Sequence, residues 1–208
     1  MYIRESLKKT LETVTGANKP SARAAQSSVR PRKPRTVMFK DDGQTPNNSG
    51  FPFICYCGAV GPTRSKDPAA VFEQLFETNG WGDSWRNGIY DYLHYHPRTH
   101  EVLGVARGKA RVRFGGDSGK VIEIKAGDVA ILPAGTGHQR ISASKDFLVV
   151  GAYPAAGTYD ECTGSADERA RALKSIPNVR VPAKDPVYGA HGPLRELWRG
   201  KRMRSAKR

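Results

Sequence analysis

Residues 88–108 read GIYDYLHYHPRTHEVLGVARG, and this stretch decides the fold prediction. Successive side chains of a β-strand point to opposite faces, so His94 and His96 share one face, roughly 7 Å apart along the strand. Pro97 interrupts strand pairing, and the bend that follows it can return Glu101 to the same side. Two imidazoles and a carboxylate are therefore expected to converge.

A second stretch, residues 127–138, supplies the fourth candidate ligand. It reads GDVAILPAGTGH, a short apolar run followed by a turn rich in proline and glycine. Such a turn lets the next strand present His138 inward. Three nitrogens and one carboxylate oxygen suit Fe, Mn, Ni, Co, Cu or Zn, whereas Ca and Mg prefer more oxygen ligands. The sequence predicts one divalent transition-metal ion held by His94, His96, Glu101 and His138.

The neighbouring His100 is an alternative ligand, because strand alternation places only one of His100 and Glu101 in the pocket. Glu101 is preferred, with Leu103 and Val105 continuing its inward face. His100 is then expected at the surface or behind the ligands.

Two further residues are candidate catalytic groups that would orient a substrate. By strand alternation Tyr92 shares the face of His94, and Arg140 shares that of His138. The alternative is that Tyr92 fills the barrel and Arg140 pairs with a carboxylate at its rim.

From Trp85 onward, short β-rich runs are separated by turn residues. Runs at this spacing favour an all-β antiparallel sandwich or barrel. The expected strands are Gly88–His96, Glu101–Ala106, Lys109–Phe114, Val121–Lys125, Asp128–Leu132, His138–Ile141 and Phe147–Tyr153.

Peripheral helices are expected on both sides of these strands. Ile3 to Val14 has helical apolar spacing, and Asp67-Pro68 begins a helix that stops at Asn79-Gly80. Ser165 and Glu168 form a capping-box pattern ahead of a helix over 169–175. The expected organisation is a basic helix and extended arm over 1–38, a β-barrel over 39–160, and a helical and irregular extension with a basic tail over 161–208.

The 208-residue chain carries a formal net charge of +14, and the excess lies at its two ends. Residues 1–40 hold ten basic and two acidic side chains, and residues 195–208 hold seven and one. Basic tails beside a balanced body are typical of solvated extensions rather than of a basic folded face. Nucleic-acid binding is therefore not expected as the main role.

The remaining composition points to the cytoplasm. The longest apolar stretch, residues 51–61, contains a proline and is shorter than the about 20 residues that span a bilayer, so no membrane segment is expected. A secretory-signal pattern is lacking, and three cysteines make an odd count, which favours a reducing compartment. Cys55 and Cys57 are assigned to a buried strand without a function.

The chain resembles the cupin family through two spaced motifs. The first is carried by Gly88, His94, His96, Glu101 and Gly108. The second is carried by Gly127, Pro133, Gly135 and His138. Ser142 stands where the second motif often has Asn. This difference affects a contact to the ligand residues from outside the site and leaves the set of metal ligands unchanged.

A wider resemblance, over about residues 39–199, is to the YjlB-type single-domain cupins. It is carried by Asp41-Asp42-Gly43, Pro46-Asn47-Asn48, Asn79-Gly80-Trp81-Gly82, Trp85-Arg86-Asn87-Gly88 and Asp185-Pro186-Val187-Tyr188-Gly189, among other segments. The resemblance implies a cupin-type antiparallel β-barrel, also called a double-stranded β-helix or jelly roll, with a metal near its centre. It implies no settled reaction, and analogy with other single-domain cupins implies a homodimer.

Two classes of function remain open at this point. The first is a metalloenzyme, dioxygenase-like or isomerase/decarboxylase-like, that acts on a small oxygenated substrate at open positions of the ion. The second is a non-catalytic module that binds a small ligand or senses a metal, because fold and metal do not define a reaction.

Overall fold

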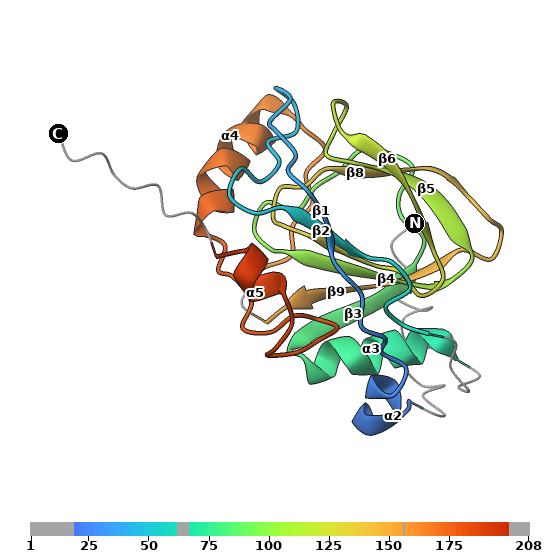
Figure 1. Cartoon of the computed structure of the whole chain (residues 1–208). Coiled ribbons are helices and arrows are strands. Elements are labelled where there is room, and N and C mark those ends of the chain that lie inside the picture. Colours follow the sequence, from blue (N-terminus) through green and yellow to red (C-terminus); the bar gives the residue numbers. More distant parts are fainter. Residues whose placement is uncertain (1–18, 62–66, 156, 200–208) are drawn as a thin grey trace.

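The computed structural model describes residues 19–61, 67–155 and 157–199, and two antiparallel β-sheets form its body (Figure 1). The larger sheet has the order β1-β2-β7-β4-β9-β3, and the smaller has the order β6-β5-β8. The strands are β1 (Arg35–Val37), β2 (Phe53–Tyr56), β3 (Trp81–Asn87), β4 (Glu101–Arg107), β5 (Lys109–Phe114), β6 (Lys120–Lys125), β7 (Val129–Leu132), β8 (His138–Ala143) and β9 (Leu148–Pro154). The all-β, jelly-roll prediction is confirmed.

Strand β4 lies in the middle of the larger sheet, between β7 and β9. Its residues alternate between the interior that faces the smaller sheet and an outer face. Leu103 and Val105 belong to the interior apolar cluster, as the sequence predicts, whereas Val102 and Ala106 belong to the outer one. A strand buried on both faces explains why β4 reads as a continuous apolar run after Glu101.

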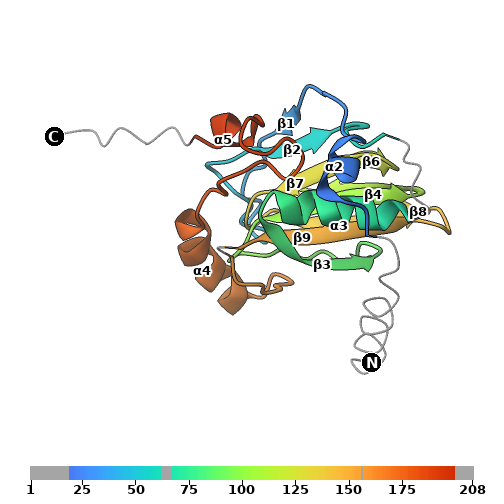
Figure 2. The ribbon, with the colours of Figure 1, turned by 90° about the horizontal axis from the view of Figure 1, so that it is seen from below.

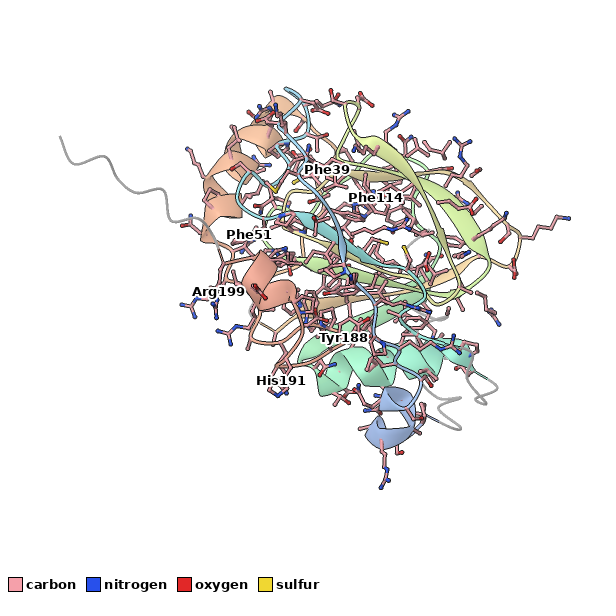
Figure 3. The ribbon with its side chains drawn as sticks, in the orientation of Figure 1. Phe39, Phe51, Phe114, Tyr188, His191 and Arg199 are labelled. Atoms are coloured by element: carbon pink, nitrogen blue, oxygen red, sulfur yellow. The ribbon has the colours of Figure 1, made fainter. Side chains whose placement is uncertain are left out.

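The interior cluster fills the space between the two sheets. Phe53 contacts Phe39 and Phe114, with ring centroids 5.8 Å and 4.7 Å away. Phe39 and Phe114 both point into this space (Figure 3). Most of the interior is therefore apolar and closed, and no ligand is needed to fill it.

Helix α3 (Pro68–Thr78) covers the outer face of the larger sheet (Figure 2). Its predicted signals are confirmed: the Asp67 side chain accepts a hydrogen bond from Ala69 N–H, and the positive φ of Gly80 follows the last turn. Phe72 lies so close to Gly104 of β4 that a Cβ at Gly104 would meet the ring at 2.3 Å. Glycine at this position lets the helix approach the sheet.

The other helices are short and peripheral: α2 (Ala22–Gln26), α4 (Ala166–Ser175), the 3-10 turn Ile176–Asn178 and α5 (Leu194–Leu197). The predicted capping box of Ser165 and Glu168 is present at the start of α4. The expected helix over residues 3–14 and the basic residues from 200 onward lie outside the described residues. Among the described helices, none is long and apolar enough to cross a membrane.

The prediction of a regular strand over Gly88–His96 is wrong. This segment makes only isolated bridges, from His94 to His138 and from Tyr95 to Cys162. A bend at Asp91-Tyr92 and the proline at 97 keep it from a continuous ladder. The sequence also missed β3, whose pairing with β9 shifts register between Gly82 and Trp85, next to Asp83 with φ of +50°. Gly82 and Asp83 have low intrinsic propensity for a β-strand, and this segment is a strand because β9 lies beside it and supplies the hydrogen-bond partners.

Candidate metal centre

Three separate segments bring the predicted ligands to one end of the interior. His94 and His96 come from the irregular segment before β4, Glu101 is the first residue of β4, and His138 is the first residue of β8. His94 and His138 form an antiparallel bridge with two backbone hydrogen bonds, of 3.2 Å and 2.9 Å. Residues opposite each other in such a bridge point to one side, and their ring centroids lie 4.0 Å apart.

The three imidazoles form a cluster that can hold a metal ion. One ligand atom from each of His94, His96 and His138 lies within 4.8 Å of the others. Glu101 is not in that group, but its Oε2 lies 3.3 Å from Nε2 of His138 and 3.8 Å from Nε2 of His96. All four side chains are buried, with relative exposures of 2–5%.

The hydrogen bonds of the imidazoles fix which nitrogen faces the centre. Nδ1 of His94 lies 3.2 Å from the Tyr92 carbonyl, and Nδ1 of His138 lies 3.2 Å from the Thr136 carbonyl. Nδ1 of His96 bonds the carbonyl of Asp160 in the same way. A carbonyl only accepts, so each Nδ1 carries the proton and each Nε2 keeps its lone pair. This is the tautomer of a histidine that binds a metal through Nε2.

Burial also sets the charge of these groups. It lowers the pKa of His94 and His96, and it lowers the pKa of His138 well below the ordinary value of 6.5. The imidazoles are therefore neutral at pH 7. Burial raises the pKa of Glu101 to about 7, although the electrostatic interaction with His94 opposes the rise.

The carboxylate of Glu101 is poorly satisfied. Among the described residues, neither of its oxygens has a hydrogen-bond partner of ordinary geometry. The Tyr153 hydroxyl acts on it from nearby and lowers its pKa, and Trp85 Nε1 donates to that hydroxyl at 2.8 Å. Nε2 of His96 and of His138 thus lie within 3.8 Å of the Glu101 carboxyl group. A buried arrangement of this kind fits a divalent cation.

His100 is not part of the cluster, and it is not at the surface either. It is fully buried, and its Nδ1 accepts a hydrogen bond of 2.9 Å from Ala134 N–H. Its ring lies 4.6 Å from that of Trp198, centroid to centroid. His100 therefore holds the turn that precedes His138.

Two asparagines that the sequence analysis gave no role hold the same turn. Asn47 accepts from Gly137 N–H at 3.2 Å, and Asn48 donates to the Ala134 carbonyl at 3.0 Å. Both side chains are buried. Their only sequence signal is that they stand together in the motif Pro46-Asn47-Asn48, and their role depends on contacts 86–90 residues away.

The two predicted catalytic residues lie in different surroundings. The Tyr92 ring is 5.5 Å from that of His94, and its hydroxyl donates to Glu161 at 2.9 Å. Arg140 forms an ion pair with Asp91 at 3.6 Å, which is the rim arrangement that the sequence left as an alternative. Sequence reasoning missed Glu161, Tyr159 and Tyr153, because nothing local marks them as neighbours of the imidazoles.

Residues 87–150 match the family model of the Cupin domain. A double-stranded β-helix with three buried imidazoles at one end of its interior is a cupin. The uncharacterized protein YjlB of Bacillus subtilis (strain 168) is 41% identical over 167 residues, which cover 80% of this chain and 98% of that protein. The chain belongs to the YjlB-type cupins.

Similar solved structures include an uncharacterized conserved protein with a double-stranded β-helix domain from Klebsiella pneumoniae subsp. pneumoniae MGH 78578. It is 16% identical, with a TM-score of 0.32, over 68% of this chain and 94% of that chain. A variant of oxalate decarboxylase from Bacillus subtilis is 22% identical, with a TM-score of 0.33, over 56% of this chain and 29% of that chain. At these scores the structures indicate nothing about activity.

Proposed function

We propose that the protein is a metalloenzyme that holds one divalent transition-metal ion through His94, His96, Glu101 and His138 and acts on a small oxygenated substrate. The observation that carries the proposal is a buried cluster of three imidazoles whose Nδ1 atoms bond backbone carbonyls, with Nε2 of His96 and His138 within 3.8 Å of the buried Glu101 carboxyl group. The ligand set suits Fe, Mn, Ni, Co, Cu or Zn. When bound, such an ion supplies Lewis acidity and, with Fe or Mn, redox chemistry.

The side chains of the protein account for the remaining parts of the site. The backbone carbonyls at Nδ1 keep the imidazoles in the binding tautomer, and burial lowers their pKa and so favours their neutral form. Tyr92 and Tyr159 lie between the imidazoles and solvent and can orient a substrate through their phenol groups. Dioxygenase-like and isomerase/decarboxylase-like reactions are both compatible with four ligands and one or two open positions.

A second candidate is a non-catalytic module that binds or senses a metal. It is favoured by the burial of all four ligand side chains, which leaves an ion little direct access to solvent. The two candidates differ in whether an outside ligand reaches the ion. With Co²⁺ bound, a change in the visible absorption on adding azide or imidazole favours an open, enzyme-like site, and a spectrum that neither changes favours the closed module.

Elemental analysis of protein purified without an affinity tag tests the metal site. About one equivalent of a transition metal is expected per chain, and His138→Ala is expected to weaken its binding at least ~100-fold. His191→Ala is the matched control, because His191 is exposed and points away from the interior (Figure 3). Stoichiometric metal in the His138→Ala variant, or a wild type that binds none of these metals, contradicts the site.

A further inference from the structure

The buried imidazole cluster approaches solvent on one side, which is marked by tyrosines. Tyr90, Tyr92 and Tyr159 are 38%, 41% and 54% exposed, and each has a ring within 5.5 Å of a cluster imidazole, centroid to centroid. The imidazoles behind them are at most 5% exposed. These three tyrosines therefore form the entrance to the site.

A single carboxylate joins the two sides of this entrance. The Tyr92 hydroxyl donates to one oxygen of Glu161 at 2.9 Å, and the Tyr159 hydroxyl donates to the other at 3.0 Å. Tyr92 and Glu161 are 69 residues apart in the chain. Hydrogen bonds to a charged acceptor are about twice as strong as neutral ones, so they hold the Glu161 side chain in place.

The backbone on either side of Glu161 is bonded to the irregular segment that carries His94 and His96. Tyr95 and Cys162 exchange two backbone hydrogen bonds of 3.0 Å. The carbonyl of Asp160 binds Nδ1 of His96. Because both neighbours of Glu161 are held, its carboxylate stays at the entrance and does not swing away with a loose loop.

The charge at this entrance is negative. The Glu161 carboxylate is held by Tyr92 and Tyr159, whose rings lie 5.5 Å and 5.1 Å from those of His94 and His96, centroid to centroid, so its charge lies close to the cluster. Arg140, the predicted substrate-binding cation, pairs with Asp91 instead.

Resting on the proposed metal site, we propose that Glu161 is a specificity-determining residue: held by Tyr92 and Tyr159, its carboxylate disfavours anionic ligands and admits neutral, oxygen-bearing ones. An incoming carboxylate meets the negative charge of Glu161, and Arg140 nearby is already paired with Asp91, so its approach costs Coulomb energy in a partly desolvated passage. A polyol, a diketone or a phenol pays no such cost, and its carbon skeleton packs against the tyrosine rings. The substrate class is thereby narrowed to uncharged oxygenated molecules.

Ligand binding to the Co²⁺-loaded protein tests this role. Azide is the anionic probe and imidazole the neutral probe, and both are titrated by the visible absorption of Co²⁺. Glu161→Gln keeps the shape and an acceptor for the phenols but removes the charge. It is expected to bind azide ~10-fold more tightly than wild type, with imidazole affinity changed less than about 3-fold. Raising the salt concentration is expected to shrink the azide difference.

Two control variants separate charge from other effects. Tyr159→Phe removes one of the two hydrogen bonds that hold the carboxylate but leaves its charge, so any gain in the ratio of azide to imidazole affinity is expected to be smaller than in Glu161→Gln. Glu123→Gln removes a carboxylate from the exposed strand β6, where Glu123 pairs with Lys109 at 4.0 Å, and is expected to change neither affinity.

The outcomes distinguish this proposal from the metal site on which it rests. A wild type that gives no Co²⁺ spectrum refutes the metal site and the role of Glu161 together. A normal Co²⁺ spectrum, with equal azide affinities in wild type and Glu161→Gln, refutes the role of Glu161 alone. Equal gains for azide and imidazole also refute it, because they indicate a wider entrance rather than selection by charge.

Discussion

The interior between the two sheets has an apolar end and a polar end, and the side chains at both ends are buried. At the apolar end, Phe53 and Val112 are at most 1% exposed, and at the polar end Glu101 and His138 are 2% exposed. The change takes place across one strand pair, because Phe114 of β5 lies opposite His138 of β8. Burial therefore does not distinguish the two ends.

What distinguishes the two ends is whether the buried atoms are satisfied. The apolar side chains gain stability from removal of their surface from water and from close packing. Burying a carboxylate without partners costs free energy instead. The polar end therefore lowers the stability of the metal-free protein, and a bound cation reverses this cost.

The largest effect is expected at the apolar end. Phe53→Ala removes a ring that contacts both Phe39 and Phe114 and leaves a cavity, which costs about 3–5 kcal/mol of unfolding free energy. Denaturant unfolding of the metal-free protein measures it. Phe53→Leu, which keeps most of the volume, is expected to lose much less, and a Phe53→Ala loss below about 1 kcal/mol would mean that this end is not close-packed.

The polar end should respond in the opposite direction. In the metal-free, folded protein the pKa of Glu101 is about 7, whereas the ordinary pKa of a glutamate, taken here for the unfolded chain, is 4.5. Between these two pH values the folded protein retains a proton that the unfolded chain releases. Stability from this group is therefore lost as the pH rises from about 4.5 and is fully lost above about 7, by up to about 3 kcal/mol. Glu101→Gln avoids this loss and is expected to be more stable at pH 8.

The measurement is the difference in unfolding free energy between Glu101→Gln and wild type from pH 4 to pH 8. The three imidazoles, whose pKa values are lowered, reduce stability in both proteins as the pH falls below 6.5. Because Glu101 itself raises the pKa of His94, this loss differs between the two proteins, and the contribution of Glu101 is read above pH 6.5. Glu101→Gln is also expected to bind metal more weakly than wild type, because it lacks the carboxylate ligand. A difference that stays constant with pH would show that Glu101 is not held in an unfavourable site.

Support of the polar end by Asn48 should have a smaller effect on stability. Asn48→Ala removes the hydrogen bond to Ala134 and leaves that carbonyl without this partner, for a cost of about 1–3 kcal/mol. Metal affinity should fall ~10-fold or more, because the turn before His138 loses a hydrogen bond that positions the His138 side chain. Asn178→Ala, on an exposed residue, is the control, and equal metal affinities in the two variants would contradict a positioning role.

The smallest effect is expected outside both ends. Lys109 and Glu123 form an exposed pair at 4.0 Å on the smaller sheet. Lys109→Ala is expected to change the unfolding free energy by less than about 0.5 kcal/mol and to leave metal content unchanged. Thermal unfolding and elemental analysis together check this prediction. A larger change would show that surface ion pairs, and not only the two ends of the interior, contribute to stability or metal binding.

Local signals in the sequence were sufficient wherever neighbouring residues decide the structure. Helix α3 begins and ends where Asp67 and Gly80 predict, and β4 and β5 lie where their apolar runs predict. The motif spacing also identified the three histidines that come together. The segment over 88–96 failed as a strand, and β3 was missed, because both depend on which neighbour offers backbone groups for pairing.

The sequence by itself determined the class of the protein, the alternation of β4 and the residue types that can bind a metal, because these follow from spacing along the chain. Only the tertiary structure decided that His100 supports a turn, that Arg140 pairs with Asp91, and that Glu161 lies at the entrance to the cluster. Those three outcomes depend on contacts between distant segments. Such contacts are set by packing and by the satisfaction of buried polar atoms, for which no short stretch of sequence carries a signal.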